Sequence, residues 1–160
     1  MTTLSRLAEA AVTSGDELPV GEPAGGPHGI DVSVVRPLPS PAVLRFTPGP
    51  RADWFTGEAL ETLAGAAYAV SSDSSRVGLR LHGPELARDR REELPSEGMV
   101  LGGIQVPASG EPLVFLNDHP TTGGYPVIGV VLAADLRLCA QLRPGDEVRS
   151  RSPAWDRGRT

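Results

Sequence analysis

The sequence predicts a mainly β protein, a barrel or sandwich with one or two short helices. It contains 19 glycines and 16 prolines in 160 residues. Both residue types end helices and mark turns, so this composition favours many short strands over a helical bundle. Aromatic residues make up only 4% of the chain, and Val, Leu, Ile and Ala must therefore fill the interior. The length suits one domain with a single core.

The first 40 residues are predicted to lie outside that core. Residues 4–12 have a modest helical pattern, and a Gly- and Pro-rich stretch at 22–41 is typical of a linker or surface strap, with a short edge strand at 32–35. His28 has no potential metal ligand nearby, which favours a solvated loop histidine. The chain is accordingly divided into three parts: an N-terminal segment with a linker at 1–40, an ordered domain at 41–151 and a flexible tail at 152–160.

The ordered domain is expected to begin with a strand at 42–46, followed by a helix. Thr56 is the predicted N-cap, because its hydroxyl can accept a hydrogen bond from a free N–H of the first turn. Trp54 and Phe55 would clamp the start of the helix. Apolar residues then recur at helical spacing and are expected to face the core: Leu60, Leu63, Ala64 and Ala67.

Two further segments precede the middle of the chain. Val77, Leu79 and Leu81 alternate with small or polar residues, which predicts a half-buried strand. The run at 84–93 is strongly charged, and we expect a solvated loop or a short surface helix there.

The middle of the chain is predicted to form short strands separated by glycine turns. These strands are expected at 99–100, 104–106 and 113–116. A loop at 117–126 follows, and the most apolar run, 127–132, predicts a central strand.

The last ordered elements are a helix and a strand. Asp135 is expected to cap the helix, which should run through Leu142. A turn at 144–146 then leads into a strand at 147–151.

Charge and cysteine content exclude several classes of function. The net charge of -5 and the pI near 5.2 argue against binding to nucleic acid or to an anionic membrane, since both need clustered cations. The single cysteine, Cys139, excludes an internal disulfide, and its apolar surroundings predict a buried, inert thiol. No apolar run approaches membrane-spanning length. We therefore expect a cytoplasmic protein with no membrane or nucleic-acid partner.

The loop at 117–126 is the strongest candidate for a ligand site. Gly123 and Gly124 free the backbone to present successive N–H groups to an anionic oxygen. Thr121 and Thr122 add two hydroxyls, and Tyr125 adds a ring with a hydrogen-bonding hydroxyl. An ordinary hairpin loop with a packed tyrosine fits the same pattern.

Other polar residues extend or limit this candidate. Ser96 and Glu97 lie at a turn, where such residues usually cap the backbone, and Gln105 is expected at the surface unless a barrel mouth receives it. Asp118 and His119 could form an acid/base pair, yet neighbouring strand residues point to opposite faces and no nucleophile elbow is present. Metal-ligand spacing and a phosphate-binding P-loop are absent from the sequence.

Four segments of the chain resemble a known family. They are GPRADWFTGEAL (49–60), SDSSRVGLRLHGP (72–84), ELPSEGMVLGGIQVPASGEPLVFLNDHPTTGGYPVIGVV (93–131) and ADLRLCAQLRPGDEV (134–148). Together they resemble the C-terminal half of the biotin-dependent carboxyltransferase family, which includes KipA, the C subunit of 5-oxoprolinase and the second subunit of allophanate hydrolase. The TTGGYP motif and the PSEG and IQVP motifs are the most specific.

The resemblance implies a cyclophilin-like β-barrel, the second of two tandem barrels. Residues 11–21 would then be the remnant of the preceding domain, and the likeness of SGDEL at 14–18 to PGDEV at 144–148 agrees with this. His119 and Pro120 depart from the family pattern, which usually has Arg or Ala and then Gln before TTGGYP.

The resemblance also implies a function. We expect a component of an ATP-dependent 5-oxoprolinase, which opens the lactam of 5-oxoproline to glutamate. Its expected partners are a KipI-type subunit and a LamB-type subunit, with ATP bound with or by these partners. The expected catalytic residues are Thr121, Thr122 and Tyr125. The expected substrate-binding residues are Ser96, Glu97, Gln105, Gly123, Gly124, Asp118 and His119.

Two alternatives stay open. One is biotin-dependent carboxyl transfer to urea or a similar small amide. The other is a non-catalytic, KipA-like module that counteracts a kinase inhibitor.

Overall fold

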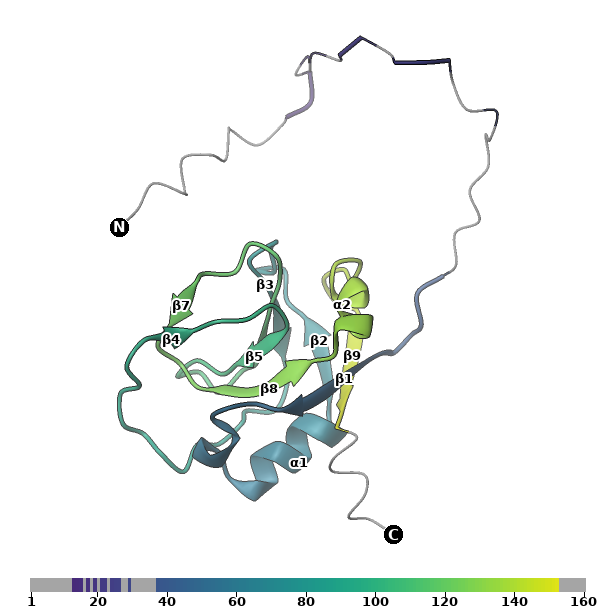
Figure 1. Cartoon of the computed structure of the whole chain (residues 1–160). Helices are drawn as coiled ribbons and strands as arrows, with labels where there is room; N and C mark the ends of the chain where they lie inside the picture. The colour runs from purple at the N-terminus through teal and green to yellow at the C-terminus, as the bar shows by residue number, and fades with distance from the viewer. Residues whose placement is uncertain are drawn as a thin grey trace. The chain divides into compact units, whose positions relative to one another are not determined.

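A computed structural model describes residues 13–15, 17, 19, 21, 22, 24–26, 29 and 37–152 (Figure 1). The chain divides into two compact units, Met1–Val35 and Arg36–Thr160, and the second contains every strand and helix named below. The helix expected at 4–12, the strand expected at 32–35 and His28 all lie outside the described residues. In the described part of the chain, no helix has the length and apolar character needed to cross a membrane.

Seven strands of the second unit close into a barrel in the order β1-β8-β5-β6-β3-β2-β9. Neighbours are antiparallel except for β1 and β9, which run parallel. The mainly β barrel predicted from the sequence is thus confirmed. The strands are β1 Ala42–Pro48, β2 Ala67–Val70, β3 Gly78–His82, β5 Gly103–Gln105, β6 Leu113–Phe115, β8 Val127–Val131 and β9 Glu147–Arg151.

Three helices and a second, two-stranded sheet accompany the barrel. The helices are the 3-10 helix η2 Ala52–Trp54, α1 Gly57–Gly65 and α2 Ala133–Cys139. The small sheet pairs β4 Glu97–Gly98 with β7 Thr122–Gly123. In Figure 1 this sheet and α2 lie on opposite sides of the barrel.

The barrel interior is filled by residues that alternate along each strand and face inward. Leu44 and Phe46 of β1 and Leu79 and Leu81 of β3 are almost fully buried, while their neighbours Arg45 and Arg80 are exposed. This period of two is what the sequence pattern predicted. The central strand β8 is also confirmed, since it pairs with β1 on one side and β5 on the other.

Helix α1 begins as predicted. The Thr56 hydroxyl accepts a hydrogen bond from the Ala59 N–H at 3.0 Å, and Leu60 and Leu63 are buried against the core. The expectation for Ala67 is wrong, because the helix ends at Gly65 and Ala67 is an exposed residue of β2.

Two strand predictions need correction. Residues 99–100 are not a strand: β4 ends at Gly98, and buried Met99 only joins the small sheet by donating its N–H to the Thr121 carbonyl at 2.9 Å. Val77 precedes β3 and is 44% exposed. Gly78 is buried on the face of β3 opposite to Leu79, where an added Cβ would come within 2.4 Å of the Leu113 side chain.

Asp135 does not cap α2. The helix starts after Leu132 and ends at Cys139, earlier than Leu142. The Asp135 carboxylate instead accepts hydrogen bonds from Arg45, at 2.9 Å from the backbone N–H, 2.8 Å from Nε and 2.7 Å from Nη2. These bonds, the guanidinium ones foremost, hold the pKa of Asp135 below its usual range. The pair therefore fastens α2 to β1.

Candidate functional site

The small sheet brings two separated motifs together. Gly98 pairs with Thr122, and Glu97 pairs with Gly123, so PSEG lies beside TTGGYP. We call residues 94–99 and 121–126 the β4–β7 arm. Thr121, Thr122, Gly124 and Ser96 are exposed on it, as a ligand-binding loop requires.

Gln105 supports the arm from within. It is only 6% exposed, which overturns the expectation of a surface position. Its Nε2 donates to the Tyr125 carbonyl at 3.1 Å and lies 3.6 Å from the Met99 sulfur. A Cβ added to Gly123 would lie 2.9 Å from this nitrogen and 3.2 Å from the sulfur. Glycine at 123 is therefore needed for the arm to rest on Gln105.

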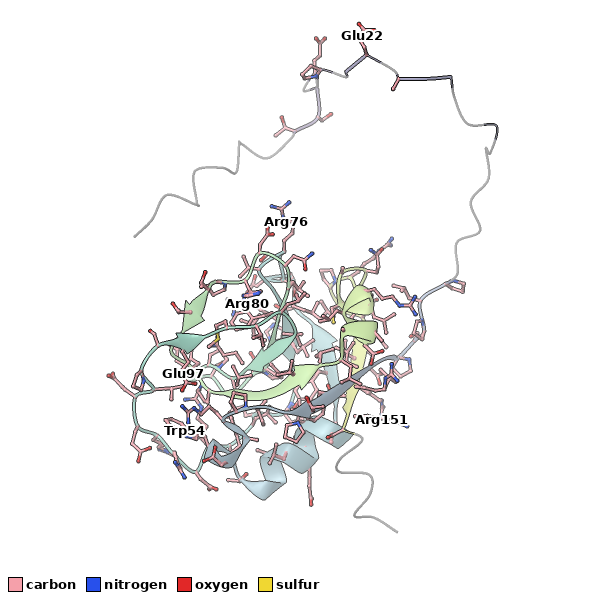
Figure 2. All side chains as sticks on the ribbon, viewed as in Figure 1. Glu22, Trp54, Arg76, Arg80, Glu97 and Arg151 are labelled. Atoms are coloured by element: carbon pink, nitrogen blue, oxygen red, sulfur yellow. The ribbon has the colours of Figure 1, made fainter. Side chains whose placement is uncertain are left out.

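Glu97 is held by an arginine. Arg51 donates from Nε to Glu97 Oε2 at 3.1 Å, and Arg51 Nη2 donates to Oε1. This pairing lowers the pKa of Glu97. Arg51 also lies over the Trp54 ring, 5.9 Å from its centroid, and Figure 2 shows Trp54 and Glu97 on the same side of the molecule. The carboxylate is thus charged and already engaged.

Tyr125 has a cationic neighbour that the sequence did not predict. The Arg88 guanidinium lies 5.8 Å from the centroid of the Tyr125 ring, and Arg88 Nη2 donates to the Val106 carbonyl. Burial lowers the pKa of Arg88. A β-bridge to Phe55 and the buried side chain of Leu86 fix this part of the loop. Leu86, the apolar residue near the start of the charged run, was the available signal that one face of 84–93 is packed.

Asp118 and His119 lie in a different environment from the arm. Asp118 forms an exposed ion pair with Arg76 at 2.9 Å. His119 places its ring 5.8 Å from Phe115 and its Nδ1 2.8 Å from the Pro120 carbonyl. Each side chain has its own partner, so the structure does not bring them together as an acid/base pair. Figure 2 shows Arg76 well separated from Glu97.

Asp118 contributes instead to an open cleft of about 720 Å³ at the barrel end between β3 and α2. We call it the mouth cleft. Its walls include Leu79, Leu101, Leu116 and Leu136. Among the ten predicted site residues, Asp118 alone lines it.

The predicted thiol Cys139 also lines the mouth cleft but is buried, as expected. Burial raises its pKa to about 11, so the group is a neutral thiol near pH 7. Within residues 37–152 and the shorter described stretches, no three His, Cys, Asp or Glu side chains converge as a metal site.

Comparisons with known proteins show which family the chain resembles. The family model described as "Carboxyltransferase domain, subdomain A and B" matches residues 1–152. The C subunit of 5-oxoprolinase from Escherichia coli is 35% identical over 134 residues, which cover 84% of this chain and 43% of that protein. The urea amidolyase of Saccharomyces cerevisiae is 30% identical over 107 residues, 61% of this chain and 6% of that protein.

Solved structures show the same fold. The crystal structure of TTHA0988 superposes with a TM-score of 0.64 at 42% identity and covers 75% of this chain and 23% of that one. The Kluyveromyces lactis urea carboxylase also gives 0.64, at 28% identity, and covers 68% and 10%. The chain spans less than half the length of the curated relatives it matches. It belongs to the family of the carboxyltransferase domain, subdomains A and B.

Proposed function

We propose that this chain is the barrel portion of a C subunit of the 5-oxoprolinase type, which takes part in ATP-dependent opening of the 5-oxoproline lactam to glutamate. The observation that carries the proposal is the similarity to the 5-oxoprolinase C subunit over 84% of the chain, which includes both motifs of the β4–β7 arm. A KipI-type subunit and a LamB-type subunit are the proposed partners, in the cytoplasm.

The arm offers suitable groups for this chemistry. Opening a lactam passes through an anionic tetrahedral species, which hydrogen-bond donors stabilise where they are held in place beforehand. The hydroxyls of Thr121 and Thr122 are exposed and have no hydrogen-bond partner among the described residues. Their backbone is fixed by the pairing of β4 with β7. We assign these hydroxyls to the substrate and Tyr125 to the wall of the site.

We assign the ATP site to the partner subunits. All 15 cationic side chains of this sequence are arginines, so it has no lysine of the kind that a P-loop places on phosphates. The glycine pair of the arm is followed by Tyr125 and Pro126 rather than by a helix N-terminus. Phosphorylation of the amide oxygen is the chemistry that ATP would supply, and no step is derived for it from this chain.

The test is a reconstituted assay. The chain is mixed with both partner subunits, and ATP-dependent glutamate release from 5-oxoproline is measured. Thr122→Ala and Tyr125→Ala should each reduce turnover by about tenfold or more, the range expected for loss of an oriented donor or wall. Thr47→Ala, which alters an exposed threonine of β1, is the matched control. Unchanged turnover in both arm variants contradicts the assigned roles, and no turnover with the native chain contradicts the function.

A second candidate is carboxyl transfer to urea. It is favoured by the similarity to urea amidolyases, and it would require carboxybiotin carried by a partner. The same complex, supplied with a carboxylated biotin carrier and urea, would then transfer the carboxyl group from biotin to urea. A complex that forms but catalyses neither reaction supports a KipA-like binding module.

A further inference from the structure

The half-buried arginines of the barrel differ in how their charge is balanced. In the described part of the chain, Arg51 and Arg88 are the arginines of intermediate exposure, and the others are exposed. Arg51 faces the Glu97 carboxylate. Arg88 has no carboxylate within ion-pair distance among the described residues, although the exposed Arg90 two residues later pairs with Asp53 at 3.3 Å.

An unbalanced, partly buried cation is costly unless something compensates it. Loss of hydration disfavours the charge. The Val106 carbonyl accepts one N–H of Arg88, and the Tyr125 ring offers a weak attraction. A guanidinium has five N–H donors in a planar fork, so most of its capacity is unused by the described residues. That fork matches the two oxygens of a carboxylate.

Arg88, with the N–H donors that the described residues leave unused, lies next to the arm. It contacts Val106, the residue after Gln105, and Tyr125, whose carbonyl accepts the Gln105 amide. The Val106 N–H in turn donates to the Pro126 carbonyl at 3.1 Å. Arg88 therefore lies where the IQVP segment and the TTGGYP motif meet, beside the exposed Tyr125 ring.

We propose that Arg88 binds the carboxylate of an anionic lactam substrate and so makes the site select 5-oxoproline over neutral amides such as urea. This inference rests on the proposed function. The inference adds Arg88 as the residue that binds the carboxylate of the substrate, while the arm hydroxyls face the lactam. Urea has no carboxylate to pair with this arginine, so the two candidate substrates make different demands on Arg88.

The experiment compares two ligands and three variants in the assembled complex. The ligands are 5-oxoproline and 5-oxoprolinamide, which is the same lactam with a neutral amide in place of the carboxylate. Arg88→Met keeps an unbranched apolar stem but removes the guanidinium, and Arg88→Lys keeps the charge. Arg91→Met, at an exposed position of the same loop, is the control. KM and kcat are measured with each ligand, and the Kd of each ligand is measured by calorimetry without ATP.

We expect Arg88→Met to raise the KM and Kd for 5-oxoproline by about tenfold or more, the loss typical of a charge-assisted hydrogen bond. Both constants for 5-oxoprolinamide should stay within about twofold, and Arg88→Lys should fall between. Equal weakening of both ligands indicates a structural role and overturns the proposal. So does native-like binding of 5-oxoproline by Arg88→Met, or failure of the native complex to bind 5-oxoproline. A native complex that binds 5-oxoproline through Arg88 but releases no glutamate refutes the proposed function and leaves the proposed role of Arg88 standing.

Discussion

The β4–β7 arm and the mouth cleft differ in what holds them. The arm contains most of the predicted site residues and depends on close backbone approaches, such as that of Gly123 to Gln105. The mouth cleft is a concave space of about 720 Å³, and its walls combine leucines with polar and charged side chains of strands, loops and α2. The comparison teaches that the mouth cleft and the polar motifs of the β4–β7 arm are separate features of this barrel. Variants in the two regions should therefore have separable effects on activity and stability.

The largest effect is expected on the arm. Gly123→Ala places a methyl group 2.9 Å from the Gln105 amide and should cost about 1 to 3 kcal/mol of stability by overpacking. Displacement of the arm should also reduce glutamate release by about tenfold or more. Gly57→Ala is the matched control, because nothing lies within 4 Å of its added Cβ and the residue lies outside the arm. Thermal denaturation and the coupled assay measure both effects, and equal behaviour of the two variants would refute the special role of Gly123.

On the α2 side of the barrel, Asp135→Ala should lower the free energy of unfolding by about 2 kcal/mol, because the Arg45 backbone N–H loses its acceptor. Turnover of the folded protein should remain near that of the native chain. Urea unfolding checks the first expectation, with Glu147→Ala at an exposed pair as the control. A loss of turnover that exceeds the loss of folded protein would place α2 and the mouth cleft in the site after all.

Acidification should affect both regions. The pKa values of Asp135 and Glu97 lie below their unfolded values, chiefly because of hydrogen bonds from Arg45 and Arg51. The stabilisation is therefore complete above the unfolded values of about 4 and is lost as the pH falls through the lower folded values. Urea unfolding from pH 7 to 2.5 should show this loss, with a flatter profile for Asp135→Asn. An unchanged slope in that variant would contradict the assignment.

The smallest effect is expected at the rim of the mouth cleft. Arg76→Ala breaks the exposed pair with Asp118 and should change stability by less than about 0.5 kcal/mol. Turnover should also stay near native if the arm is the site. A large rise in KM for 5-oxoproline in this variant would transfer the binding site to the mouth cleft and make the predicted role of Asp118 credible.

The sequence predicted those parts of the fold that depend on local pattern. The apolar run of β8, the alternation of Leu79 and Leu81 in β3 and the Thr56 cap are set by neighbouring residues, and each was found as expected. Strand β2 was missed because it follows α1 with only Tyr68 and Val70 facing inward. Two buried residues are too few to establish a period of two.

The site could be predicted in composition but not in geometry. Strands β4 and β7 have two residues each, and their pairing joins Gly98 to Thr122, which no local periodicity reveals. Gln105 was misplaced because it does face away from Ile104 and Val106, but Met99 and Tyr125 of the arm cover that face, which no local pattern reveals. Arg88 was hidden among charged neighbours, most of which are exposed.

The closing strand has a consequence for how the chain tolerates shortening. Strand β9 pairs with β1 on one side and with β2 on the other. A chain interrupted before Glu147 would leave two strand edges without partners at once, and such edges recruit strands from other molecules. Through its 5 residues, β9 thus covers both edges, and we expect chains that lack it to aggregate.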